Sequence, residues 1–187
     1  MREKITIPES QKEIPLHKFQ EFMEGYIEEN DDHNKLLAFK VFLGIDFKKF
    51  NKMRVEDIDG IWRVITIALN EQPKLTKTFE HEGVEYGFIP DINAISWGEY
   101  IDAEAFFTDP KNYHKLLAVL YRPVIRKKGE LYDIENYTGL GNRPEIFKNV
   151  SLAIYSGVAV FFYHLSKALL ETTRPFSTQR EEATHSP

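Results

Sequence analysis

The spacing of apolar residues predicts a chain built mainly of amphipathic helices. Apolar residues recur every three or four positions over residues 16–27, 36–43 and 55–69, with a shorter amphipathic segment at 47–50. That period places them on one face of a helix. Pro73 ends the third long segment, because proline lacks the N–H that a helix interior needs.

The middle of the chain changes to the pattern of strands. Residues 75–88 predict a β-hairpin, with Gly83 at the tight turn because glycine readily takes a positive φ. Residues 124–134 predict a second small hairpin that turns at 128–129. Residues 4–7 alternate polar and apolar side chains, which indicates a short edge strand.

Helix signals return after the first hairpin. Ser96 and Glu99 have the spacing of a capping box, in which each side chain bonds the other residue's backbone N–H. They predict a helix through about residue 106. Three of its apolar residues are expected to pack it against the rest of the protein: Trp97, Tyr100 and Ile101.

The next predicted helix begins at Asp109 and ends before Pro123. Arg122 lies at its end, where a positive charge favours the negative end of the helix dipole. The arginine is also a candidate partner for Glu99 or Asp102, which the preceding helix carries.

A long apolar segment near the C-terminus allows two interpretations. Val150 to Leu165 has no formally charged residue, but Ser151, Ser156 and His164 interrupt it. A membrane-spanning helix needs about 20 apolar residues, so this run is short. We expect a buried helix over 151–171 and keep a membrane-associated protein as an alternative.

These elements define the expected fold class, which is α+β and predominantly α. We expect a helical bundle of about six helices with one or two small β-hairpins beside it. Residues 1–173 should form a single α-rich domain. Residues 174–187 should form a disordered, flexible tail, because Phe176 is the one large apolar residue there.

Composition narrows the classes of function. The chain has 187 residues, of which 42% are hydrophobic, and a formal net charge of −5. Nucleic-acid binding depends on clustered Lys and Arg, whereas this chain carries a net negative charge. We therefore predict no direct nucleic-acid binding. The sequence has no cysteine, which excludes disulfides, thiolate metal sites and cysteine nucleophiles.

No motif indicates catalysis, a cofactor or a metal. The sequence 57–60 resembles the start of a calcium loop, but Ala68 stands where the loop needs a glutamate. Gly139 and Gly141 lack the lysine of a phosphate loop, and turn geometry explains them. No two histidines have the spacing of a helical metal site. We therefore predict a protein without enzymatic activity, cofactor or metal.

Two segments carry a resemblance to a known group of proteins. Residues 86–102 read YGFIPDINAISWGEYID and residues 114–124 read HKLLAVLYRPV. Together they resemble small proteins encoded in the virion-morphogenesis modules of tailed bacteriophages. The opening ITIPES and the late KALL extend the likeness over about residues 4–171.

The resemblance implies a non-enzymatic structural or assembly protein in the neck, tail or connector region of the virion. Its partners would be portal, connector or tail proteins, it would be oligomeric in the assembly, and it would reside in the virion or the host cytoplasm without a membrane. Two alternatives remain open: a tail-assembly chaperone absent from the mature particle, and a small cytoplasmic enzyme with a dispersed site. The candidate partner-binding residues are Phe79, Tyr86 and Phe88 of the first hairpin, with Phe176 of the tail.

Overall fold

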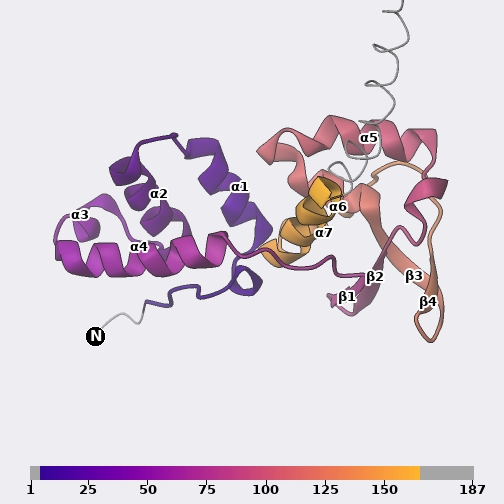
Figure 1. The fold of residues 1–187 in the computed structure, drawn as a ribbon, viewed down its shortest axis with the longest axis horizontal. Coiled ribbons are helices and arrows are strands. Elements are labelled where there is room, and N and C mark those ends of the chain that lie inside the picture. The colour runs from indigo at the N-terminus through magenta and orange to yellow at the C-terminus, as the bar shows by residue number, and fades with distance from the viewer. Residues whose placement is uncertain (1–4, 165–187) are drawn as a thin grey trace, which may run out of the picture.

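A computed structural model describes residues 5–164, in which the elements form two groups lying side by side (Figure 1). The first group holds α1 (Leu16–Gly25), α2 (Asp31–Leu43), α3 (Phe47–Phe50) and α4 (Val55–Leu69). The second holds a β-sheet with α5 (Trp97–Phe107), α6 (Tyr113–Leu120) and α7 (Arg143–Phe147). Three short 3₁₀ turns are η1 (Gln11–Glu13), η2 (Ile92–Ala94) and η3 (Pro110–Asn112), and residues 152–164 form a further helix.

The sheet joins both predicted hairpins. Its four antiparallel strands are β1 (Thr78–His81), β2 (Val84–Phe88), β3 (Tyr121–Lys128) and β4 (Leu131–Ile134), in that spatial order. Both predicted hairpins, β1–β2 and β3–β4, are present, and Gly83 has φ 77° at the first turn. The second begins earlier than predicted, because α6 ends at Leu120 and Arg122, expected at the end of that helix, lies in β3. The pairing of β2 with β3, which sets Phe88 opposite Tyr121, was not predicted.

The expected α+β class is confirmed, but the expected helical bundle is wrong. The helices divide between a helical group and a helix–sheet group, because the joined sheet offers an aromatic surface on which α6, α7 and residues 152–164 pack. The expected strand at the N-terminus is also wrong in its described part, since residues 5–7 form no regular structure. The predicted domain boundary at 173 and the tail at 174–187 lie outside the described residues.

The chain before α1 holds the two groups together. The backbone N–H of Leu16 donates to the carbonyl of Val150 at 2.8 Å, and the N–H of Leu152 donates to the carbonyl of Ile14 at 2.8 Å. Side chains from both groups belong to one hydrophobic cluster, which includes the fully buried Leu16 and Leu152. Buried backbone groups need partners, so these bonds fix the first group against the second.

The last described helix is buried over its first half. Leu152 and Val158 are buried, whereas Tyr163 is exposed. Among the described residues, no helix is long and apolar enough to cross a membrane. Gly157 allows this helix to approach the chain before β1, because a Cβ at this position would lie 2.7 Å from the carbonyl oxygen of Lys74.

A polar contact between α1 and α6 also links the two groups of elements. The Gln20 amide donates to the carbonyl of Pro110 at 2.6 Å and contacts Nδ1 of His114 at 3.0 Å. Burial, supported by the nearby positive charge of Lys148, lowers the pKa of His114 below 6.5. The imidazole is therefore held neutral between the two groups of elements.

Replacing Gly157 with Ala should destabilise the protein by about 1–3 kcal/mol, because the backbone of residue 74 must move to admit the methyl group. Gly60→Ala is the matched control. Gly60 lies inside α4 with nothing within 4 Å of an added Cβ, so alanine should stabilise by about 0.5–1 kcal/mol. Urea unfolding of both variants measures the difference. Equal effects would show that the close approach at Gly157 does not exist in solution.

Acidification should destabilise the protein through His114. Because its pKa in the folded protein is depressed, its contribution is complete above the unfolded value of 6.5 and is lost as the pH falls from there through the folded pKa. The free energy of unfolding, measured between about pH 5 and 7, should fall more steeply for the wild type than for His114→Gln. His164→Gln changes an exposed histidine and should keep the wild-type slope. Identical slopes for all three proteins would refute a depressed pKa at His114.

Candidate interaction surface

The hairpin residues predicted to bind a partner lie in the protein's own core. Tyr86 and Phe88 are each 4% exposed. Phe79 stacks on Tyr86 with ring centroids 5.7 Å apart and meets the edge of Tyr121 at 5.1 Å. Tyr86 and Phe88 are therefore buried in this structure, whereas Phe79 is half-buried, and Phe176 lies outside the described residues.

An exposed aromatic surface lies instead on α5. Trp97, Tyr100 and Phe107 are spaced three and seven residues apart, which places them on one side of the helix. Trp97 is 76% exposed and Tyr100 is 46% exposed, and their rings stack with centroids 5.7 Å apart. The prediction that Trp97, Tyr100 and Ile101 pack the helix is wrong, because all three are exposed. We call Trp97, Tyr100 and Phe107 the aromatic face of α5.

The predicted capping box starts this helix and is confirmed. The Ser96 hydroxyl accepts the backbone N–H of Glu99 at 3.3 Å, and the Glu99 carboxylate accepts the backbone N–H of Ser96 at 2.7 Å. Two of the N–H groups that every helix leaves unpaired at its start are satisfied in this way. The first turn of α5, which carries Trp97, is therefore well defined.

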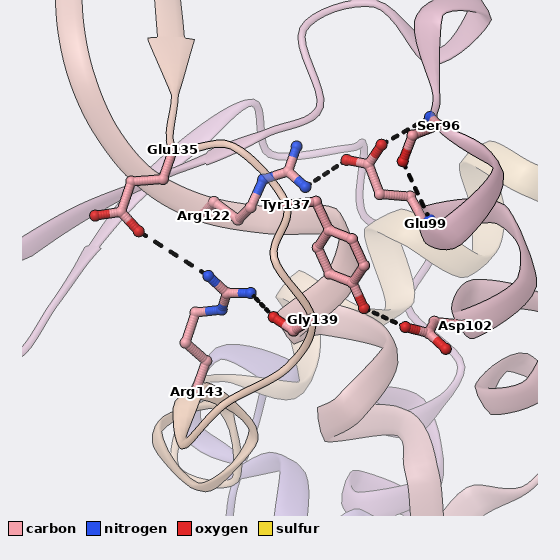
Figure 2. Close-up of polar contacts among 8 residues, drawn as sticks. All are labelled: Ser96, Glu99, Asp102, Arg122, Glu135, Tyr137, Gly139 and Arg143. Carbon is pink, nitrogen blue, oxygen red and sulfur yellow. Dashed lines mark hydrogen bonds and ion pairs between the residues drawn. The ribbon is translucent and has the colours of Figure 1, made fainter.

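The same glutamate forms a buried ion pair with β3. Figure 2 shows the Arg122 guanidinium donating to the Glu99 carboxylate. Glu99 was one of the two partners predicted for Arg122. The side chains of Arg122 and Glu99 are 6% and 8% exposed, respectively. Burial alone would raise the pKa of Glu99, but the bonds from Ser96 and Arg122 outweigh it, so the pKa lies below the ordinary value. The pair is charged and ties α5 to the sheet.

The loop after β4 closes around this pair (Figure 2). The Tyr137 hydroxyl donates to Asp102, and burial together with this bond raises the pKa of Tyr137. The guanidinium groups of Arg122 and Arg143 lie 5.6 and 6.0 Å from the centre of the Tyr137 ring, within the range of cation–π contacts. Arg143 also donates to the carbonyl of Gly139, whose φ of 90° favours glycine. The cluster is therefore an anchor for α5.

A groove runs beside the aromatic face of α5. Its volume is about 560 Å³, and α5, α6 and the helix at 152–164 contribute its walls. The residues that matter most for its chemistry are Tyr100, Glu104, Phe107, Leu116, Phe162 and Tyr163. Glu104 is the one charged side chain among the described lining residues. The groove and the aromatic face form one continuous apolar surface, because they share Tyr100 and Phe107.

The sequence held a signal for this surface. α5 carries apolar residues on more than one side, since Ala103 and Phe106 face the core while Trp97, Tyr100 and Phe107 face outward. A helix that is apolar on most sides is either buried all round or has a partner. Periodicity alone does not say which apolar side of a helix meets the core, and for this reason the sequence does not reveal that Trp97, Tyr100 and Ile101 are exposed.

The fold and this surface define a mixed α+β protein that presents an exposed aromatic helix face. Within residues 5–164, no group of three or more His, Asp or Glu residues is placed to hold a metal ion. The chain matches no family model, no curated protein and no solved structure. The surface of α5 is thus the feature on which a function can be argued.

Glu99→Ala should cost about 3–5 kcal/mol of stability, because it leaves the Arg122 charge buried without a partner and removes the carboxylate's half of the capping box of α5. Asp133→Ala is the control, since it breaks a pair with Arg126 whose side chains are 81% and 51% exposed, and it should cost less than about 1 kcal/mol. Urea unfolding measures both. Adding Arg122→Met to Glu99→Ala should recover part of the loss. A Glu99→Ala cost no larger than that of Asp133→Ala would contradict the anchoring role.

Proposed function

We propose that this protein is a non-enzymatic structural or assembly protein of a tailed bacteriophage, which acts through protein–protein contacts in the neck, tail or connector region. Two features support the proposal. The segments that resemble phage morphogenesis proteins contain the first part of α5, up to Asp102, and the Arg122 that anchors it. The second feature is the exposed Trp97–Tyr100 pair, and this observation carries the proposal.

Exposed aromatic side chains of this kind are characteristic of binding surfaces. Trp and Tyr are enriched among the residues that contribute most to protein–protein affinity. A contiguous apolar patch on a protein surface commonly marks an interaction site. Here Trp97 and Tyr100 continue into the apolar groove through Phe107, so the surface is larger than a single exposed ring.

The anchoring of α5 favours binding as well. Ordering a mobile surface costs free energy when a complex forms, and a surface held in place beforehand avoids most of that cost. The capping box and the buried pair of Glu99 with Arg122 fix the start of α5 before any partner arrives. The partners proposed for this surface are portal, connector or tail proteins, and the protein is expected to be oligomeric within the assembly.

Replacing Trp97 and Tyr100 together with Ala should abolish stable complexes with the phage protein that binds this surface. Each candidate encoded beside this protein would be co-expressed with it, and complexes would be measured by size-exclusion chromatography with light scattering. We expect affinity to fall by at least about 2 kcal/mol while stability changes little, since both rings are exposed. Ile67→Ala removes an apolar side chain that is 63% exposed on α4 and should leave the complex intact.

Two results would count against the proposal. A complex that survives Trp97→Ala with Tyr100→Ala but fails with Ile67→Ala would place the binding surface on the helical group. A complex with none of the neck, connector or tail proteins would remove the proposed role itself. Mass spectrometry of purified particles then separates a virion component, present at fixed stoichiometry, from an assembly factor that leaves the particle.

A further inference from the structure

The groove beside α5 has the shape of a helix-binding surface. It is open to solvent along one side, and its walls are helices: α5, α6 and residues 152–164. Pockets for small molecules usually enclose most of the ligand and place several polar groups to orient it. The described lining here is mostly apolar, with the Glu104 carboxylate and a few hydroxyl groups as its polar atoms. A long apolar occupant fits this shape better than a compact polar ligand does.

The backbone of the occupant limits its conformation. The groove walls are helical, so their interior N–H and C=O groups are already paired within each helix. An extended peptide would bury backbone groups that find no partner here, and each such group costs about 1–3 kcal/mol. A helix satisfies its own backbone and presents apolar side chains on one face. The groove therefore selects a helix over a strand.

The charge of the groove limits the chemistry of the occupant. α5 contains Glu99, Asp102 and Glu104 and no basic residue, and the first two are engaged by Arg122 and Tyr137. Glu104 is exposed within the groove and has no ion pair among residues 5–164. Two copies of α5 facing each other across a two-fold axis would bring their acidic side chains together, and these like charges would repel each other. A basic partner is favoured over a second copy.

We propose that this groove binds an amphipathic helix of another protein, with apolar residues at i, i+4 and i+7 and a Lys or Arg that pairs with Glu104. The inference rests on the proposed function, because it names the class of partner segment that the surface of α5 takes. Trp97 would lie at one end of the bound helix and Phe107 toward the other, with Glu104 between them on the same side of α5.

Fluorescence of Trp97 can test this directly. Trp62 is the second tryptophan of the chain, so the full-length Trp62→Phe variant leaves Trp97 as the single reporter. The probe is a synthetic amphipathic helix of about 18 residues with Leu on one face and Lys on the other. We expect it to shift the Trp97 emission to shorter wavelength. A scrambled peptide of the same composition should bind about tenfold more weakly or not at all.

Charge reversal tests the role of Glu104. Glu104→Lys should weaken binding of the Lys peptide by about fivefold and strengthen binding of a matched peptide with Glu in place of Lys by a similar factor. Glu21→Lys reverses an exposed glutamate on α1 and should change neither affinity. Tyr100→Ala and Phe107→Ala should each weaken both peptides by about tenfold, because they remove groove contacts.

Several results would overturn the inference. Equal binding of the scrambled peptide would refute a helical occupant, and an unchanged peptide preference in Glu104→Lys would refute the charge pairing. Dimers that disappear in Phe107→Ala would identify a second copy as the occupant. A red shift of Trp97 emission in full-length Phe176→Ala would identify the chain's own C-terminal segment. If no peptide binds but Trp97→Ala with Tyr100→Ala still breaks a phage complex, the proposed function stands without this partner class.

Discussion

The buried ion pair between Glu99 and Arg122 determines how the helix–sheet half of the protein is arranged. It joins the first turn of α5 to the beginning of β3, next to the pairing of β3 with β2. Burying two charges is costly, and the cost is offset only where the geometry is good and the remaining polar atoms are satisfied. Here Ser96 bonds the same carboxylate and the ring of Tyr137 lies beside the guanidinium, although Nε of Arg122 is buried without a hydrogen-bond partner among the described residues. The pair therefore fixes the rotation of α5 about its axis.

That rotation decides which side of α5 meets the core and which meets solvent. With Glu99 directed at the sheet, Ala103 and Phe106 pack inward, and Trp97 and Tyr100 are left on the outside. An exposed tryptophan contributes little to folding, yet it supplies a rigid and largely apolar contact to a partner. The same ion pair thus links the stability of the fold to the presentation of the surface.

Local signals in the sequence predicted local structure well. Ser96 and Glu99 bond each other across a single helical turn, and Gly83 turns a hairpin between adjacent strands, so neighbouring residues determine both features. The pairing of β2 with β3 depends on residues more than 30 positions apart, such as Phe88 and Tyr121, and no local pattern encodes it. For the same reason the sequence does not show that Tyr86 is buried, since Phe147 contacts its ring only after the distant segments have met.

Photo-cross-linking in cells can identify what the aromatic face of α5 contacts. A photoreactive benzophenone amino acid would replace Tyr100 on α5, or Ile67 on α4, in phage-producing cells, and the linked peptides would be identified by mass spectrometry. We expect position 100 to link to a basic amphipathic helix of a neck, connector or tail protein, and position 67 not to link to it. Links from position 67 to that protein with none from position 100, or links from position 100 only to another copy of this chain, would contradict the proposed binding surface.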